Sequence, residues 1–429
     1  MNMNMMHPAD QLVMIMERIY GYGMTTMSGG NLSILDDNGD IWITPGSIDK
    51  GNLTRNDIVC IKADGTIQGI HKPSSEYPFH QKIYQMRPDL RAVLHAHPPA
   101  LVAYSIVRKI PNTSIIPNVK FTCGDITIAK YGLPGSTDLG EKIAEEFKKG
   151  FNTVVLENHG VVVGANSMSD AFKSFETLDF CARLEIEATR IGKPTSLSDE
   201  QITWYKNKQV LKMDEFIANK ISSEEKAARR DMCNLIHRAY HQELFTSTQG
   251  TYSQRLDNDS FIINPHGKDR KYLEPEDLVR INGEYKELGK EPSRSVELHR
   301  EIYKQHPHVN SIILAHPPNI MAFVVSDQML DSKTIPESYI LMRDIPKLEF
   351  GSIYLKPKET AAVFDESTPI AMVQNDCVIV TGSSMLNAYD RLEVAEYSAK
   401  AIIASKELGE IVSINQQEID DIKVAFHLK

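Results

Sequence analysis

Residues 93–99 of this 429-residue chain read Val93-Leu94-His95-Ala96-His97-Pro98-Pro99. The apolar run before the prolines predicts a β-strand. Side chains of a strand alternate between its two faces, so His95 and His97 point the same way, roughly 6.5 to 7 Å apart along the backbone. This spacing allows two imidazoles to bind one ion. The alternative is a pair of ordinary core or surface histidines, and the rest of the sequence must decide between the two.

Two further segments favour a metal site. A second apolar strand ends in Glu157-Asn158-His159-Gly160, and Glu76 lies upstream, in Pro73-Ser74-Ser75-Glu76-Tyr77. Three neutral imidazoles with an open fourth position are the usual arrangement of a catalytic zinc ion, and a nearby carboxylate supplies the base. The sequence therefore predicts one divalent ion per chain, preferably Zn²⁺, at His95, His97 and His159. Glu76 is the candidate acid/base, and its alternative role is that of a solvated carboxylate at a helix start.

Composition narrows the classes of protein. The length predicts two or three domains, and 41% hydrophobic residues are enough for real cores. The net charge of −10 disfavours nucleic acid or an anionic membrane as a partner. No segment has the roughly 18 consecutive apolar residues of a membrane span. Five cysteines without a CxxC pair, and a Met-rich start without a basic region, predict a cytoplasmic protein.

The second half of the chain repeats the first. Ser28-Gly29-Gly30-Asn31-Leu32-Ser33 returns as Thr248-Gln249-Gly250-Thr251-Tyr252-Ser253, and residues 53–61 (LTRNDIVCI) return as residues 273–281 (LEPEDLVRI). One residue is then lost, and the register continues with Pro73 and Pro292, His80 and His299, and His97 and His316. A repeat of this length indicates tandem domains, which we expect to span residues 1–220 and 221–429.

The candidate chemistry is present in only one copy. Three of its four residues change: Glu76 corresponds to Ser295, His95 to Leu314 and His159 to Asp376. The fourth, His97, is retained as His316. The polar framework survives, including His80 as His299, so we interpret His80 as part of the scaffold. We expect an active first domain and a second domain without the metal site.

Each half has the pattern of a mixed α and β fold. In the first half, hairpins are predicted around Asp37-Asn38-Gly39 and Ala63-Asp64-Gly65. Further strands are predicted at residues 91–96 and 153–157, and helices at 10–22, 77–85, 137–149 and 169–191. Residues 193–226 are polar and are expected to join the two copies.

Five motifs in order carry a family resemblance: Ser28-Gly29-Gly30-Asn31, Thr44-Pro45, Ser74-Ser75-Glu76, His95-Ala96-His97-Pro98 and Asn158-His159-Gly160. With them the first half resembles the class II aldolase/adducin family, and the second half resembles it in framework only. The resemblance implies a three-layer α/β/α domain with a central, mostly antiparallel sheet. It also implies the same zinc ligands, His95, His97 and His159, with Glu76 as the acid/base.

The resemblance further implies a phosphate site made of three small-residue segments. They are Gly30-Asn31, the turn Thr44-Pro45-Gly46-Ser47, and Ser74-Ser75. Backbone N–H groups in tight turns bind dianions together with hydroxyl groups, without lysine. The alternative is that these are ordinary turns, which are rich in the same residues. The family usually has Thr-Pro-x-Gly, from which residues 44–47 depart.

The implied activity is a zinc-dependent lyase that cleaves a ketose 1-phosphate into dihydroxyacetone phosphate and an aldehyde, with fuculose-1-phosphate aldolase as the closest named type. A divalent ion that chelates the ketone and its neighbouring hydroxyl stabilises the enediolate left by C–C cleavage. Related dehydratases and decarboxylases remain alternatives. The 4-epimerases carry Asp at the position of Glu76, which argues against them. A non-enzymatic, adducin-like scaffold describes the second half well.

The resemblance also bears on assembly. Family members are typically fourfold tetramers with each site between neighbouring subunits. Two chains with tandem domains would therefore form a homodimer that is a pseudo-tetramer of domains.

Overall fold

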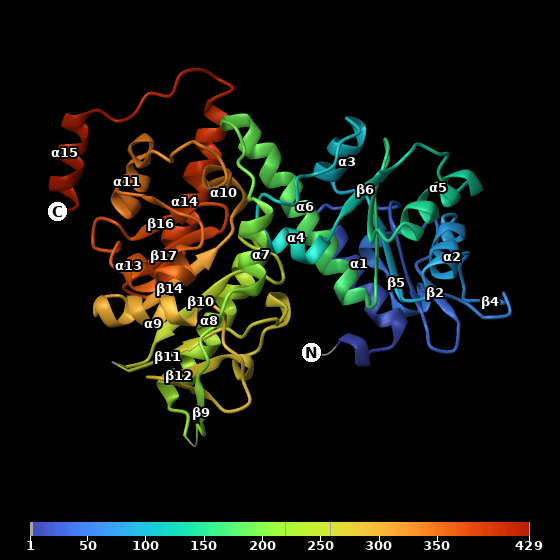
Figure 1. The fold of residues 1–429 in the computed structure, drawn as a ribbon, viewed down its shortest axis with the longest axis horizontal. Coiled ribbons are helices and arrows are strands. Elements are labelled where there is room, and N and C mark those ends of the chain that lie inside the picture. Colours follow the sequence, from blue (N-terminus) through green and yellow to red (C-terminus); the bar gives the residue numbers. More distant parts are fainter. Residues whose placement is uncertain (1–2, 219, 258, 429) are drawn as a thin grey trace. The chain divides into compact units, whose positions relative to one another are not determined.

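The computed structural model describes residues 3–218, 220–257 and 259–428. They form two compact units. The first comprises residues 1–114 and 118–183, and the second comprises residues 115–117 and 184–429, the undescribed residues excepted. Each unit contains one large sheet with helices beside it (Figure 1). These units are called the first and the second domain below. Within the described residues, no helix combines the length and the apolar character needed to cross a membrane.

The first domain is built on an eight-stranded sheet. Its strands lie in the order β4 (Ile67–Gln68), β3 (Val59–Ile61), β2 (Ile41–Ile43), β1 (Asn31–Leu35), β5 (Ala92–Ala96), β8 (Val161–Ala165), β7 (Thr153–Leu156) and β6 (Ile126–Ala129). All neighbours are antiparallel except β6 and β7. The predicted hairpins are therefore confirmed as β1–β2 and β3–β4, and the sheet is mostly antiparallel.

Helices cover both faces of this sheet, which gives the three predicted layers (Figure 1). The helices of the first domain are α1 (Pro8–Gly21), α2 (Tyr77–Met86), α3 (Pro99–Ile106), α5 (Thr137–Lys148), all of α4 (Pro117–Cys123) except Pro117, and α6 (Met168–Ile191) as far as residue 183. Helices α2 and α5 share a buried cluster with the sheet, in which Phe79 and Ile143 pack near Val93. On the other face, Arg18 of α1 lies 4.2 Å from the ring centroid of Phe172 in α6.

The second domain repeats the arrangement with nine strands. Their order is β15 (Lys347–Leu348), β16 (Ile370–Val373), β17 (Cys377–Gly382), β14 (Ser311–Ala315), β10 (Thr251–Arg255), β11 (Ser260–Ile263), β12 (Val279–Asn282), β13 (Tyr285–Glu287) and β9 (Asp214–Phe216). Its helices are α7 (Asp199–Asn207), α8 (Ser223–His241), α9 (Val296–Gln305), α10 (Pro318–Val324), α11 (Pro336–Met342), α12 (Ser352–Leu355), α13 (Pro357–Ala361), α14 (Met385–Ser405) and α15 (Gln416–Ala425).

The strand register confirms the internal repeat. Asn31 of β1 is paired with His95 of β5, and Thr251 of β10 is paired with Leu314 of β14. The two sheets differ at one edge, where β9 adds a strand parallel to β13. Strand β9 and helix α7 both come from residues 193–226, the polar segment expected to join the copies, and both belong to the second domain.

Candidate metal centre

His95 lies at the centre of the first sheet, on β5 between β1 and β8. It is fully buried, and its ring contacts Phe79 of α2 edge-on. Its Nδ1–H donates a hydrogen bond to the carbonyl oxygen of Val161, at 2.9 Å. This bond fixes the tautomer, so the lone pair of Nε2 faces away from the strand. A backbone carbonyl that orients the second ring nitrogen is the usual support of a metal-binding histidine.

The other two histidines are supplied by the ends of neighbouring strands. His97 follows β5, and His159 lies in the turn between β7 and β8, which closes through a hydrogen bond from the N–H of Leu156 to the oxygen of Gly160. A Cβ atom on Gly160 would lie 2.6 Å from Cδ2 of His97 and 2.6 Å from the oxygen of Ala96. Only glycine therefore allows this turn to approach His97 so closely.

The three imidazoles converge as the sequence predicts. Their ring centroids are 4.7, 4.8 and 4.9 Å apart, and Nε2 of His97 is 3.0 Å from Nε2 of His95. Within the described part of the chain, His95, His97 and His159 are the one group of three or more potential ligands whose nitrogen, sulfur or carboxylate atoms come this close. Such a set of converging nitrogens fits a tetrahedral Zn²⁺ with one open position.

Electrostatics keep these rings neutral. Burial, and after it the neighbouring histidines, lower the pKa of His95 and of His97 to about 3. Burial also lowers the pKa of His159, although the charge of Glu76 opposes this. Neutral imidazole is the form that binds a metal, so the triad needs no deprotonation at neutral pH.

Glu76 completes the cluster from the start of α2. It occupies the N-cap position but makes no capping hydrogen bond with its side chain. Its Oε2 lies 3.4 Å from Nε2 of His95, and its Oε1 lies 3.8 Å from Nε2 of His159. The residue is only 8% exposed, and its buried Oε1 has no hydrogen-bond partner. It is therefore not the solvated carboxylate of the alternative interpretation, and it has one oxygen free to face a ligand.

A chain of hydrogen bonds behind Glu76 escaped the sequence argument. Nδ2 of Asn31 donates to Oε2 of Glu76 at 2.7 Å, and Nε2 of His80 lies 2.5 Å from Oδ1 of Asn31. Nδ1 of His80 contacts the hydroxyl of Ser33 at 2.7 Å. His80 is thus a structural residue, as expected from its presence in both halves. It contacts the amide of Asn31, which in turn contacts Glu76. The spacing of Glu76 and His80, one helical turn apart, is the signal that could have revealed this.

The three predicted phosphate-binding segments are brought together beside Glu76. Pro45 pairs with Pro73, and the N–H of Ser74 donates to the oxygen of Thr44 at 3.3 Å. Several of their polar groups are already used: the hydroxyl of Thr44 accepts from Leu32, and the N–H of Gly46 donates to Lys72. Gly30 is left-handed, with φ of 71°. Ser47 and Ser75 are exposed and have the most accessible hydroxyls of this set.

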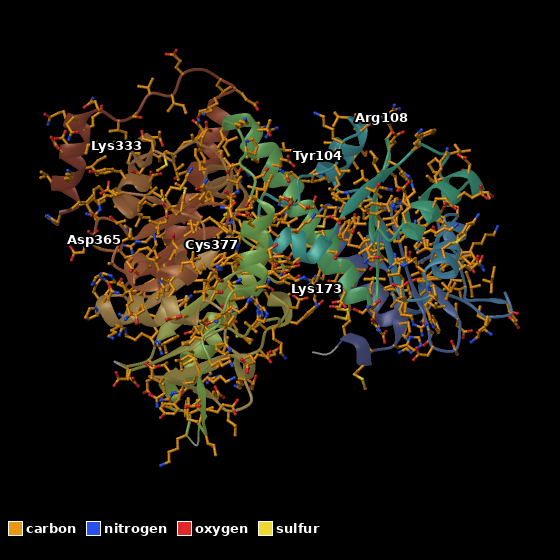
Figure 2. The ribbon with its side chains drawn as sticks, viewed as in Figure 1. Tyr104, Arg108, Lys173, Lys333, Asp365 and Cys377 are labelled. Carbon is orange, nitrogen blue, oxygen red and sulfur yellow. The ribbon has the colours of Figure 1, made fainter. Side chains whose placement is uncertain are left out.

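A helix end lies next to the His159 turn. The N–H of Asn158 donates to the oxygen of Ser105, and Nε of Arg108 lies 3.8 Å from Oε2 of Glu157. Figure 2 labels Tyr104 and Arg108 at this end of α3. The motifs did not mark this helix as a neighbour of the candidate metal centre.

The second domain has the same framework around different residues. Ser295 is the N-cap of α9, and its hydroxyl lies 3.1 Å from that of Ser293. His316 is half-buried, and the loss of solvent around its ring lowers its pKa to about 4. Asp376 is buried, with no hydrogen-bond partner for its Oδ2. With Leu314 in place of His95, this domain cannot form the same triad.

Known proteins resemble the chain in both halves. The family model described as "Class II Aldolase and Adducin N-terminal domain" matches residues 10–186 and again residues 230–403. A 5-deoxy-D-ribulose 1-phosphate aldolase of Bacillus thuringiensis is 30% identical over 196 residues, which are 45% of this chain and 91% of the relative. A 3-oxo-tetronate 4-phosphate decarboxylase of Haemophilus influenzae is 30% identical over 40% of this chain and 84% of its own. An L-fuculose phosphate aldolase of Methanococcus maripaludis is 32% identical over 41% and 93%.

Proposed function

Because this chain belongs to the class II aldolase and adducin family, we propose that its first domain is a Zn²⁺-dependent aldolase that cleaves a ketose 1-phosphate into dihydroxyacetone phosphate and an aldehyde. The observation that carries the proposal is the convergence of three neutral imidazoles on one point, with the buried carboxylate of Glu76 beside them. The relatives named as aldolases of 5-deoxy-D-ribulose 1-phosphate and L-fuculose phosphate support this reaction class.

The residues of the site have different proposed roles. His95, His97 and His159 would hold the ion, and the bound ion would supply the Lewis acid that stabilises negative charge developing on the ketose oxygens. Glu76 would carry the proton that the carbon of the broken bond must gain. Asn31 holds one oxygen of Glu76, so the free Oε1 is the atom we assign to proton transfer. A general acid/base placed in this way contributes about 10²- to 10⁴-fold to a rate.

The phosphate of the substrate would be bound by the segments beside Glu76, namely Gly30-Asn31, Thr44 to Ser47 with Gly46, and Ser74-Ser75. The bridge between Pro45 and Pro73 holds two of these segments together. The exposed hydroxyls of Ser47 and Ser75 supply hydrogen-bond donors, and neither segment carries a basic side chain. A phosphate here would therefore be held by hydrogen bonds rather than by ion pairs.

A decarboxylase is the second candidate, because a relative of similar identity is named as a 3-oxo-tetronate 4-phosphate decarboxylase. Both reactions leave an electron pair on a carbon next to a carbonyl group. In both, the same ion could stabilise the resulting negative charge and the same acid could protonate the carbon. The two candidates differ in the bond that breaks and hence in the second product, which is an aldehyde for the aldolase and CO₂ for the decarboxylase; both release dihydroxyacetone phosphate.

Metal content and product analysis test the proposal together. Elemental analysis of the purified chain should give one equivalent of zinc, and none for His95→Ala, whereas His316→Ala should retain it. A screen of ketose 1-phosphates should then release dihydroxyacetone phosphate, detected with a coupled dehydrogenase. Release of CO₂ together with dihydroxyacetone phosphate from 3-oxo-tetronate 4-phosphate, with no aldehyde released from any ketose 1-phosphate, would favour the decarboxylase. Two equivalents of metal, or none in the native chain, would contradict the proposed centre.

A further inference from the structure

The second domain has gained basic side chains at the positions where the first domain has its proposed phosphate-binding turns. His266 corresponds to Gly46, and Arg294 corresponds to Ser75. The two turns that carry them are held together as in the first domain: Pro265 pairs with Pro292, and the N–H of His266 donates to the oxygen of Glu291 at 3.0 Å. The two basic residues therefore extend from adjacent turns at the end of the second sheet.

A third basic side chain comes from the segment of this domain that precedes the repeat. Lys208 follows α7, and its Nζ lies 3.2 Å from the ring centroid of Tyr205 and 4.5 Å from that of Tyr354. Nζ also donates to the backbone oxygen of Tyr205 at 3.1 Å. These contacts hold the ammonium group in place by cation–π attraction. Burial, and after it the charge of Arg294, lower the pKa of Lys208 to about 7. Tyr354, which Lys208 contacts, packs against the buried cluster that contains Val296, two residues after Arg294.

These cations are not neutralised within the domain. Among the described residues, neither Lys208 nor Arg294 has a carboxylate oxygen within the 4.0 Å of an ion pair. The acid whose charge acts on Lys208 is Asp376, at the position of His159, and burial raises the pKa of Asp376 to about 7 in spite of Lys208 and Arg294. The other acid near His266, Glu291, pairs with Lys286. Lys208 and Arg294 therefore share one buried carboxyl group. Burial, and after it the charges of Arg294, Arg270 and Lys208, lower the pKa of His266, which can still donate a hydrogen bond as a neutral imidazole.

Hydrogen-bond donors lie beside the cations. The hydroxyls of Thr251 and Ser293 are 2.7 Å apart, and those of Ser293 and Ser295 are 3.1 Å apart. Ser295 begins α9, a helix of ten residues, and makes no capping hydrogen bond with its side chain. The helix start and the hydroxyls both favour an anion at this place. Lys208 and Arg294 are partly exposed, so a solute can reach them.

We propose that the second domain is a metal-free binding site for a phosphate dianion, either free phosphate or the phosphate group of a small ester, held by Lys208, His266 and Arg294. This inference rests on the proposed function of the first domain: the copy without the metal ligands would replace hydrogen-bond recognition of phosphate by ion pairing with Lys208 and Arg294, to which His266 adds a hydrogen bond. Arg294 supplies a planar fork that matches two phosphate oxygens, and Lys208 supplies a point charge. The second domain then retains a ligand without retaining a reaction.

Calorimetry of the full chain tests this site with two probes, inorganic phosphate and dihydroxyacetone phosphate. The native chain should bind dihydroxyacetone phosphate at two sites, and the double variant Lys208→Met/Arg294→Gln should lose one of them or weaken it at least tenfold, while cleavage by the first domain continues. Arg300→Gln, on the same helix α9, is the matched control and should change nothing. If inorganic phosphate competes fully at the lost site, free phosphate suffices; if only the ester binds there, the rest of the ester contributes.

A second measurement does not depend on how well the variant folds. Lysine acylation of the native chain, read peptide by peptide by mass spectrometry, should modify Lys208, and either probe should protect it. Lys356, which is exposed on the same domain, serves as the unprotected reference. Protection of Lys208 equal to that of Lys356, or full binding stoichiometry in a folded double variant, would overturn the proposal.

Discussion

Glu76 is the residue on which turnover should depend most. We expect Glu76→Gln to retain the metal and to lose about 10²- to 10⁴-fold in rate, because an amide cannot carry the proton. The amide can still face Asn31 and the imidazoles, so the fold should be kept. Metal analysis and a rate assay on the same sample separate the two effects. Glu141→Gln, on the exposed face of α5, is the control. A loss below tenfold would show that another group moves the proton.

His80 and His299 offer a matched pair for a positioning role. Both contact a serine through Nδ1, Ser33 at 2.7 Å and Ser253 at 2.6 Å. Only His80 has a partner for Nε2, since Nε2 of His299 is buried without one. We expect His80→Gln to lower kcat by roughly 10- to 100-fold, the cost of a lost buried hydrogen bond, with the substrate KM less affected.

The same change in the second domain supplies the comparison. His299→Gln should destabilise the second domain about as much as His80→Gln destabilises the first, because each change removes a buried hydrogen bond to a serine. His299→Gln should leave kcat unchanged. Equal effects of the two variants on kcat would mean that His80 acts through stability alone and does not position Asn31 against Glu76.

Asp376 should make the second domain less stable at neutral pH than in mild acid. Burial raises its pKa to about 7 in the folded chain, above the ordinary value near 4 that it has when unfolded. The folded state therefore holds a proton that the unfolded state releases, and this contribution to stability falls as the pH rises from about 4 to 7.

The variant Asp376→Asn should remove this dependence. In phosphate-free buffer, urea unfolding should show a gain in stability at pH 8, by on the order of a few kcal/mol, and little gain at pH 4. Asp365→Asn is the contrasting control, because a hydrogen bond from Ser367 lowers the pKa of Asp365 and its contribution has the opposite sign. A gain that does not change with pH would contradict the prediction. Asp365 and Cys377, the neighbour of Asp376, are labelled in Figure 2.

At the scale of the element, the turn between β7 and β8 should control metal affinity. A methyl group on Gly160 would meet Cδ2 of His97 and the oxygen of Ala96 at 2.6 Å. We expect Gly160→Ala to displace His97 or His159 and to weaken metal binding by about 10- to 100-fold, the range seen when the support of a ligand is altered. Competition with a chelator measures this. Gly21→Ala, where a Cβ atom meets nothing within 4 Å, should leave the affinity unchanged.

The elements also show which parts of the site a sequence can predict. Strand β5 and its two histidines follow from a local pattern, and so does His159 at the end of β7. The hydrogen bond from His95 to Val161 could not be predicted, because it depends on the pairing of β5 with β8, a strand that the local pattern did not mark. The hydrogen bond from the amide of Asn31 to Glu76 could not be predicted either, because it depends on the register of β1 against β5; the role of Asn31 in phosphate binding stays a prediction.

Lys208 was missed for a different reason. Its segment is polar, and polar sequence between two domains has the composition of a linker. The position of Lys208 is fixed by its contacts with the rings of Tyr205 and Tyr354. These two tyrosines lie about 150 positions apart in the sequence, so no local pattern could predict that they share a contact. The absence of the metal ligands from the second copy follows directly from the alignment of the two halves of the sequence. The basic cluster could not be predicted in this way, because its residues come from separate turns that only the fold brings together.

At the scale of the whole molecule, we expect the fused second domain to complete the active assembly. Two chains would form a pseudo-tetramer of domains in which each metal site is completed by residues of a metal-free domain. Residues 1–220 expressed alone should then fold and bind zinc but lose most activity, which a rate assay and sedimentation analysis can show. A fragment that is monodisperse, loaded with zinc and fully active would mean that the second domain completes nothing.

Strand β9 has a practical consequence for how the chain can be divided. It covers the outer edge of β13 by parallel pairing at Tyr285, Lys286 and Glu287, yet it lies at residues 214–216, before the repeat begins. A cut at residue 220 would strip this cover from the second sheet and leave the backbone N–H and C=O groups of β13 open to other chains. Open sheet edges of this kind template aggregation. The second domain should therefore stay dispersed when it starts near residue 184 and self-associate when it starts at 221.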